Sequence, residues 1–397
     1  MAGAYQGPSY VPVTLTKFPS PSVITDIAYL SPNDLLVALA YPGEIHLLPT
    51  TTVFDPSDKP AARQPATRLL HSFTGCICEA IAVLDKRSFV VATSHIHDAT
   101  TPQLRRKPGT GALWLVQATP GGTRATEEPR GLSIEELLDI PDAQWLKHMT
   151  TLPKQDDAPN DRPILLVTDT TAGVILVINL DTKKVEAKVV HETMLPAPNA
   201  SEKIGINGIA YHDNYVYYTN TYAQTIYRIE VNPSHYVYIT DRAPDPLIRK
   251  PHRFPQIGNL VLTTAPRSTL SRTYCPSIRS RPHIYAASSG LVVTVGCKNW
   301  SSEEQWKWSK LYTMFDTLTF TGGTSIAFGE GNVGNPQRCN YPAKPGPKLW
   351  VATRDYEGVA RVIRLDVTTG GREARVAGDE KRPRYMKQMK VKHRRAR

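Results

Sequence analysis

The sequence predicts an all-β fold, a six-bladed β-propeller with a central channel pocket. Strand-like runs dominate the 397 residues, and helical periodicity is sparse. One strand–turn–strand unit recurs six times, at a spacing of roughly 40 to 50 residues for the better-preserved copies, as in propeller blades. The repeated β-rich run of this unit lies at 34–40, 88–94, 163–169, 215–221, 259–265 and 348–354.

The first copy shows how a blade is built from the unit. Its β-rich run "DLLVALA" ends in a small residue and is followed by a second strand, "EIHLLPT". A further short apolar segment, "VITDIAYL", precedes it. Each copy therefore supplies three strands, and we expect a fourth, because propeller blades are four-stranded sheets.

The repeats divide the chain into a propeller with two extensions. We expect an N-terminal extension over 1–20, the propeller over 21–378, and a basic, disordered tail over 379–397. The fifth copy is the weakest, and 273–314 lacks the repeat pattern. We expect an irregular insertion there, either a lid, a loop or an artefact of gene prediction.

Composition narrows the classes of function. Hydrophobic residues make up 41% and charged residues 21%, which is typical of a soluble globular protein. The formal net charge of +11 is concentrated in "EKRPRYMKQMKVKHRRAR" at the C-terminus, and we do not expect the chain to bind nucleic acid.

The N-terminus lacks the pattern of a secretory signal, and no run is apolar enough for a membrane helix, so we expect a cytoplasmic protein. The five cysteines are interpreted as ordinary thiols, and the oligomeric state stays open.

Asn207 is the first candidate for a functional residue. It lies in the small-residue turn "GING", just before an alternating strand. An asparagine in this position can cap a turn or point into a pocket. The following strand "YVYYTNTY" places Tyr218, Asn220 and Tyr222 on one face, and one face of this strand is expected to line the channel. Neither a G-x-S-x-G elbow nor a phosphate-binding loop occurs, which argues against a serine hydrolase and a nucleotide-dependent enzyme.

Three stretches carry a resemblance to a known family. The segments "WLKHMTTL", "ILLVTDTTAGVILVINLDTKK" and "GINGIAYHDNYVYYTNT", together with the six-fold pattern, resemble the senescence-marker-protein/gluconolactonase-like six-bladed propellers in their fungal branch. The resemblance covers about residues 20 to 370. Similar fungal proteins belong to secondary metabolism, and some are hetero-Diels–Alderases that join a polyketide-derived quinone methide to a terpene. Other members are lactone hydrolases that hold one divalent cation at the mouth of the channel.

The resemblance also implies that most ligands of that cation site are replaced in this chain. Asn207 matches the metal-binding asparagine, whereas the glutamate of the first blade corresponds to Thr25 and a further asparagine to Lys147. The expected aspartate before "GNLVLTT" has no counterpart. A lysine ammonium would repel a cation, and one amide oxygen is too small a ligand set for a hard divalent metal. We therefore expect no metal and no other cofactor.

The leading hypothesis is a metal-independent biosynthetic enzyme of fungal secondary metabolism. It would bind a hydrophobic polyketide or terpenoid intermediate as its small-molecule partner and catalyse a cyclisation or a hetero-Diels–Alder cycloaddition. Lys147 and Asn207 are the candidate catalytic residues, and the candidate substrate-binding residues are Thr25, His148, Tyr218, Asn220 and Tyr222. A metal-dependent lactone hydrolase that uses Asn207, Asp316 and Asp26 is the first alternative, and a non-catalytic ligand-binding propeller is the second.

Overall fold

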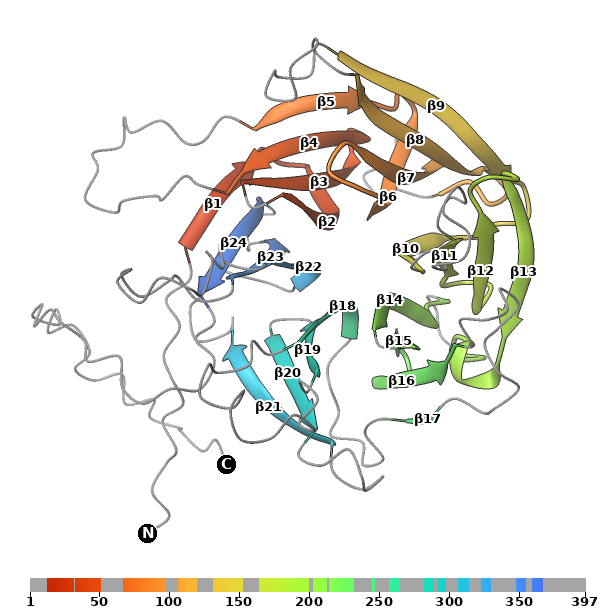
Figure 1. Cartoon of the computed structure of the whole chain (residues 1–397), viewed down its shortest axis with the longest axis vertical. Coiled ribbons are helices and arrows are strands. Elements are labelled where there is room, and N and C mark those ends of the chain that lie inside the picture. Colours follow the sequence, from red (N-terminus) through yellow and green to blue (C-terminus); the bar gives the residue numbers. More distant parts are fainter. Residues whose placement is uncertain are drawn as a thin grey trace, which may run out of the picture.

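The computed structural model of the chain consists of antiparallel sheets arranged around one axis (Figure 1). The structure describes residues 13–31, 33–50, 67–97, 106–119, 131–152, 164–199, 203–212, 214–231, 245–246, 257–264, 282–288, 291–297, 306–313, 323–329, 348–354 and 359–366. The all-β propeller class predicted from the sequence is confirmed. No helix in these ranges is long and apolar enough to cross a membrane.

The described strands form six four-stranded sheets, and five of them follow the order of the chain. Sheet I contains β2 (Val23–Ser31), β3 (Asp34–Tyr41), β4 (Glu44–Pro49) and β5 (Arg68–Ser72). Sheet II contains β6 (Cys76–Val83), β7 (Ser88–His95), β8 (Gly111–Thr119) and β9 (Gly131–Ile140). Sheet III contains β10 (Leu146–Thr151), β11 (Ile164–Asp169), β12 (Val174–Asn179) and β13 (Lys184–Val190).

The remaining sheets complete the ring. Sheet IV contains β14 (Ile206–His212), β15 (Tyr215–Asn220), β16 (Thr225–Glu230) and the short β17 (Asp245–Pro246). Sheet V contains β18 (Ile257–Thr264), β19 (Pro282–Ser288), β20 (Leu291–Cys297) and β21 (Trp306–Thr313). Sheet VI joins β22 (Gly323–Gly329), β23 (Lys348–Arg354) and β24 (Ala360–Asp366) to the N-terminal strand β1 (Val13–Phe18). A 3₁₀ turn, η1 (Glu192–Met194), precedes sheet IV.

Two of the expected boundaries differ from the structure. The segment 273–314, expected as an irregular insertion, contributes β19, β20 and β21 to sheet V. Runs such as "HIYAAS" and "LVVTVG" are rich in β-branched residues and form strands although they do not match the repeat. Residues 13–18 of the expected N-terminal extension pair antiparallel with β24 and thereby close the ring. The basic tail lies outside the described residues.

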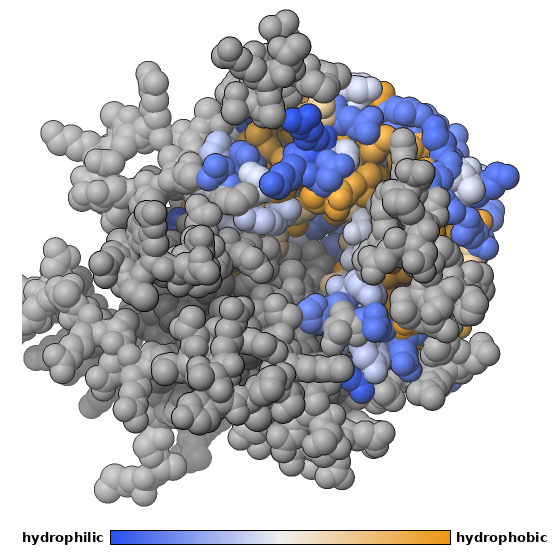
Figure 2. All heavy atoms as spheres, in the orientation of Figure 1, coloured by the Kyte–Doolittle hydropathy of each residue, from blue (hydrophilic) through white to orange (hydrophobic). Residues whose placement is uncertain are grey.

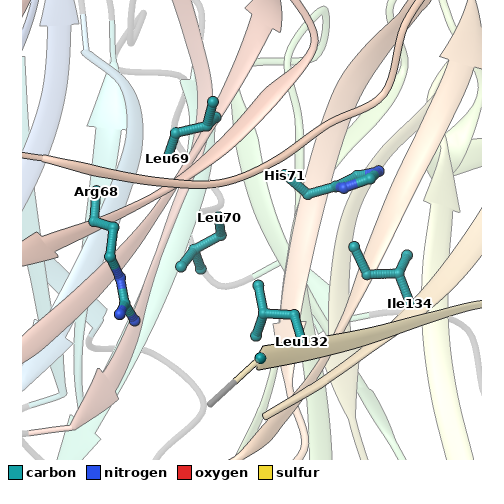
Figure 3. A pocket seen from close by; sticks show the side chains of 7 residues that line it. Arg68, Leu69, Leu70, His71, Leu132 and Ile134 are labelled. Atoms are coloured by element: carbon teal, nitrogen blue, oxygen red, sulfur yellow. The ribbon is translucent and has the colours of Figure 1, made fainter. Parts of the chain in front are cut away.

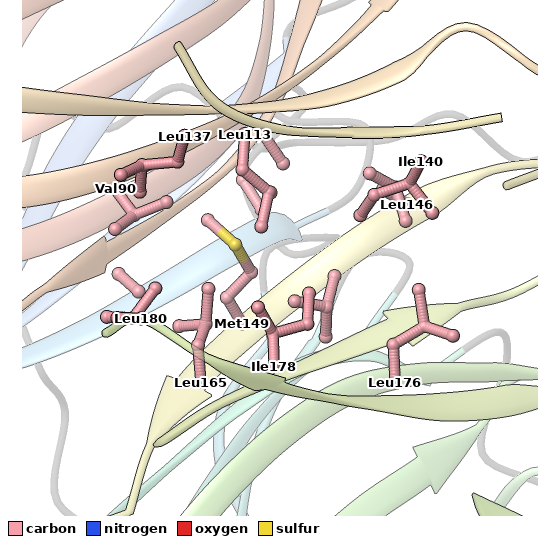
Figure 4. Packing of buried hydrophobic residues seen from close by; sticks show 14 of the residues in the cluster. Val90, Leu113, Leu137, Ile140, Leu146, Met149, Leu165, Leu176, Ile178 and Leu180 are labelled. Carbon is pink, nitrogen blue, oxygen red and sulfur yellow. The ribbon is translucent and has the colours of Figure 1, made fainter. Parts of the chain in front are cut away.

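The core lies between neighbouring sheets. In β3, Leu35, Val37 and Leu39 pack towards sheet VI, whereas Leu36 and Ala38 pack towards sheet II. Both faces of this strand are therefore buried, which explains its nearly continuous apolar sequence. Figure 4 shows the corresponding layer between sheets II and III, with Met149 of β10 among leucines and isoleucines of both sheets.

The outer strands have a different composition. β13 alternates exposed and half-buried residues, and β9 does so over most of its length. Figure 2 shows hydrophilic residues along this rim and hydrophobic residues in the layer inside it. A surface hollow of about 390 Å³ lies between β5 and β9 on the rim (Figure 3), lined by Arg68, Leu69, Leu70, His71, Gly131, Leu132 and Ile134. None of the predicted site residues lines it.

Candidate active site

A β-bulge interrupts the innermost strand of every sheet near its first residues. The strands β2, β6, β10, β14, β18 and β22 each contact the next around the axis. Their pairing with the second strand shifts register at equivalent points, after Ile24, Cys78, Leu146, Ile206, Ile257 and Gly323. A bulge re-aims a side chain out of the regular alternation of a strand and is common beside active sites. The bulges therefore define a ring of special positions at one end of the axis.

The predicted residues Thr25, Lys147, His148 and Asn207 all occupy these bulges. Glu79, which the sequence analysis did not single out, occupies the bulge of β6. Aligning "TDI", "EAI", "KHM" and "NGI" as copies of one repeat would have placed Glu79 in this set.

Glu79 is the centre of a buried ionic network. Its carboxylate has no exposed surface and accepts from both Nε and Nη2 of Arg106, with the Nη2 contact at 2.9 Å. The indole Nε1 of Trp145 donates to the same carboxylate at 3.3 Å. The guanidinium of Arg106 lies 3.9 Å from the centroid of the Trp145 ring, a cation–π geometry. This paired arrangement fixes the orientation of both Arg106 and Trp145.

Asp169 at the end of β11 holds Trp145 from the other side. Its carboxylate accepts from the backbone N–H groups of Gln144 and Trp145 at 2.7 and 3.1 Å. It also caps the following turn by accepting from Thr171 and Ala172. The loop that leads into β10 is therefore rigidly attached to sheet III, and with it the first residues of that strand.

Lys147 lies next to this network. Its ammonium is 5.6 Å from the centroid of the Trp145 ring, and it makes no hydrogen bond or ion pair with any residue of the described ranges. Burial lowers the pKa of Lys147; Glu79 and Asp26 oppose this shift, whereas the Arg106 cation adds to it. The amine can therefore act as a hydrogen-bond donor whose bonding capacity the protein does not use.

Asp26 connects three sheets. Its Oδ1 accepts from the Ser325 hydroxyl of β22 at 2.6 Å and from the Ile27 N–H at 2.9 Å, and its Oδ2 accepts from the Ile81 N–H of β6 at 2.9 Å. Burial raises the pKa of Asp26 to about 6, against the effect of these donors and of Lys147. Thr25 has a similar structural role, because its hydroxyl donates to the Cys78 carbonyl of sheet II at 2.6 Å.

Thr168 joins the bulges of β10 and β14. Its hydroxyl accepts from the His148 backbone N–H at 3.1 Å and donates to the Asn207 carbonyl at 2.7 Å. His148 is buried, and burial lowers its pKa well below the usual value, with Lys147 contributing to the same shift. The ring is therefore neutral at physiological pH. The segment before Asn207 packs so closely on η1 that a Cβ on Gly205 would lie 2.3 Å from the Met194 carbonyl oxygen.

The two polar atoms of the Asn207 side chain differ in their hydrogen bonding. Its Nδ2 donates to the Thr221 hydroxyl at 2.9 Å, which fixes the amide orientation. Its buried Oδ1 makes no hydrogen bond of acceptable geometry to a described residue, although the amide lies close enough to His148 to favour the charged imidazole. Within the described ranges, Nδ2 of Asn207 therefore has a hydrogen-bond partner and Oδ1 has none.

Three predicted substrate-binding residues are placed elsewhere. Tyr218 is fully buried between sheets III and IV, stacks on Tyr227 and hydrogen-bonds Thr193 at 2.5 Å. Asn220 donates to the carbonyls of Thr193 and Leu195 and accepts from the Ala223 N–H.

Tyr222 lies beyond the end of β15 and is 60% exposed. The expectation that this face lines the channel is corrected, because β15 is the second strand of its sheet and its faces point towards neighbouring sheets.

The residues present do not fit the divalent-cation site of the resembling propellers. The Asn207 oxygen is available, but Glu79 is paired with Arg106, and Asp26 accepts three hydrogen bonds. The ammonium of Lys147 lies close enough to both carboxylates to interact electrostatically. A cation would compete with Arg106 and repel Lys147. Within the described ranges, no group of three acidic, histidine or cysteine side chains could hold a metal ion. Asp316 lies outside these ranges.

Comparisons with known proteins give the fold and no closer assignment. No protein-family model matches the chain, and no curated protein matches it. Among solved structures, a calcium-binding regucalcin from Agrobacterium tumefaciens superposes with a TM-score of 0.51 at 11% identity, covering 90% of this chain and 95% of the other. A putative oxidoreductase (glucose dehydrogenase) from Thermus thermophilus has a TM-score of 0.50 at 14% identity, covering 90% and 100%. At these identities the likeness establishes a shared β-propeller fold.

Proposed function

We propose that the chain is a metal-independent enzyme that cyclises a hydrophobic small molecule, in a cyclisation or hetero-Diels–Alder cycloaddition of fungal secondary metabolism. In this proposal the six sheets are the six blades, and the substrate binds where their bulges meet. The observation that carries the proposal is the Lys147 ammonium, which lies beside a rigid ionic network without a hydrogen-bond acceptor of its own among the described residues. Polyketide and terpenoid substrates are implied by the sequence resemblance alone.

The chemistry requires little from side chains. Cycloaddition is accelerated mainly by holding two reacting groups in the geometry of attack. A hydrogen-bond donor to the carbonyl of the electron-poor partner lowers the barrier further, because negative charge develops on that oxygen. Lys147 would supply this donor, and the available Asn207 Oδ1 would accept from a hydroxyl or N–H of the substrate. Arg106 and Trp145 would hold the site rigid without changing during the reaction.

The test compares Lys147→Ala with wild type. Removing a donor to a developing oxyanion typically costs about 2.7 to 4 kcal/mol of barrier, so turnover should fall roughly a hundredfold or more. The measurement is product formation and stereoselectivity from a quinone methide generated in situ with an alkene partner, compared with the reaction without protein. The matched control is Lys188→Ala, which removes an exposed lysine paired with Asp142 on the outer rim.

Two outcomes would overturn this proposal. The first is a wild-type rate and stereochemistry equal to those of the reaction without protein. The second is Lys147→Ala with unchanged kinetics at equal folded concentration. Lactone hydrolysis that is abolished by a chelator and restored by a divalent metal would favour the hydrolase alternative, for which the available oxygen of Asn207 is the supporting observation.

A further inference from the structure

The ionic groups at the bulges of β2, β6 and β10 differ in how far their hydrogen-bonding capacity is used within the protein. Glu79 and Arg106 neutralise each other through a two-point contact, and the Trp145 indole donates a third hydrogen bond to the Glu79 carboxylate. Such paired contacts satisfy both the carboxylate and the guanidinium. Glu79 is therefore already engaged by these three donors, although its charge still acts on a third charged group nearby.

Lys147 is that third group. It makes no ion pair or hydrogen bond within the described ranges, and its nearest charged neighbours are Glu79, Arg106 and Asp26. Both carboxylate oxygens of Asp26 already accept hydrogen bonds from β2, β6 and β22. Two carboxylates and two cations balance in formal charge, but the Lys147 ammonium has no hydrogen-bond acceptor among the described residues. A shielded ammonium with unused donors is costly, and a ligand that supplies the acceptor removes this cost.

We propose that Lys147 is the anchor of an anion site, and that the ligand of this protein is an organic acid bound through its carboxylate. The inference rests on the proposed function only in placing the ligand at the bulges; it does not depend on a cyclisation. It identifies the class of substrate by its charge, which the resemblance to other propellers leaves open. The rigid Glu79–Arg106–Trp145 network lies beside Lys147 and limits how far the ligand carboxylate can enter the site.

The experiment is isothermal titration calorimetry of the purified full chain with three ligands that differ mainly in charge: benzoate, benzamide and benzylammonium. Benzoate should bind at least about tenfold more tightly than benzamide, which corresponds to about 1.4 kcal/mol. Benzylammonium should bind most weakly of the three.

Variants locate the site. Lys147→Gln should abolish the preference for benzoate over benzamide, Lys147→Arg should retain it, and the rim variant Lys188→Gln should leave it unchanged. If Lys147→Gln does not fold, the affinities of wild type and Lys147→Arg for benzoate, benzamide and benzylammonium test the inference instead. Equal affinities for benzoate and benzamide, including no measurable binding of either, would overturn the inference, as would tighter binding of benzylammonium. Because these ligands do not react, selective benzoate binding without cyclisation activity would contradict the proposed function alone.

Discussion

The innermost strands and the second strands of the sheets use buried polar residues differently. Asn220 lies on the second strand β15. Its Nδ2 donates to the carbonyls of Thr193 and Leu195 at η1, and its Oδ1 accepts from the Ala223 N–H in the turn after β15. Lys147 on the innermost strand β10 makes no such contact with a described residue, and Asn207 on β14 uses only its Nδ2. Both kinds of side chain are polar and shielded from water. Of these three residues, Lys147 and Asn207 keep bonding capacity for a ligand, whereas Asn220 uses its amide within the protein.

This difference follows from the architecture. The faces of a second strand meet neighbouring sheets, so a polar group there must be satisfied within the protein or destabilise it. A bulge on an innermost strand turns its side chain out of that packed layer. The comparison predicts that substitutions on second strands change stability, whereas substitutions at the bulges change binding, unless the bulge residue belongs to the ionic network.

The largest effect is expected for Glu79→Gln, which tests that exception. Breaking a buried pair by removing one charge leaves Arg106 without its partner and should lower the free energy of unfolding by about 3 to 5 kcal/mol. The measurement is urea denaturation followed by tryptophan fluorescence. The matched control is Glu135→Gln, which removes an exposed partner of Lys183 and should cost less than about 1 kcal/mol. Similar losses for the two variants would mean that the network at the axis is no more important than a surface ion pair.

The second effect is the pH dependence due to Asp26. Its pKa is raised from 3.8 to about 6 in the folded protein, so folding favours the protonated form. The stability it contributes is fully present below about pH 4 and is lost as the pH rises through 6. The difference of about 2 pH units corresponds to about 3 kcal/mol.

The Asp26 effect is measured as the unfolding free energy of wild type minus that of Asp26→Ala across this range. Subtraction removes the contribution of the other carboxylates. A difference that is constant with pH, or that grows as the pH rises, would show that the Asp26 carboxylate is stabilised as the charged form.

A smaller pair of effects compares the two asparagines directly. Asn220→Ala leaves two carbonyls of the η1 connection without their donor and should cost about 1 to 3 kcal/mol of stability, with benzoate binding and turnover unchanged. Asn207→Ala loses one hydrogen bond to Thr221 and should cost about 1 kcal/mol, but it should reduce turnover. Thermal melting and kinetics on both variants check this. The reverse assignment of stability and activity would contradict the distinction between second and innermost strands.

The sequence predicted what depends on local pattern. Nearly continuous apolar runs such as "LLVALA" and "ILLVTD" identify strands buried on both faces, and their six-fold recurrence predicts a propeller. Bulges are not visible in such patterns, because they are set by how one strand pairs with the next. Glu79 was missed for this reason, and so was its pairing with Arg106, which is 27 residues away in the chain. Tyr218 and Asn220 were assigned to the channel because alternation gives the two faces of a strand but not its position in the sheet.

The smallest effect is expected for Tyr222→Ala. The sequence analysis placed this tyrosine with the substrate-binding residues, whereas the structure leaves 60% of it exposed beyond the end of β15. An exposed side chain away from caps and networks changes stability by less than about 0.5 kcal/mol when it is truncated. We therefore expect the melting temperature, benzoate affinity and turnover of the variant to match wild type. Tyr211→Ala is measured beside it, because the Tyr211 side chain is half-buried and its hydroxyl donates to Asn214 in the turn between β14 and β15. A tenfold fall in turnover for Tyr222→Ala alone would mean that the ligand extends from the bulges over the end of sheet IV, and that the turn after β15 belongs to the site.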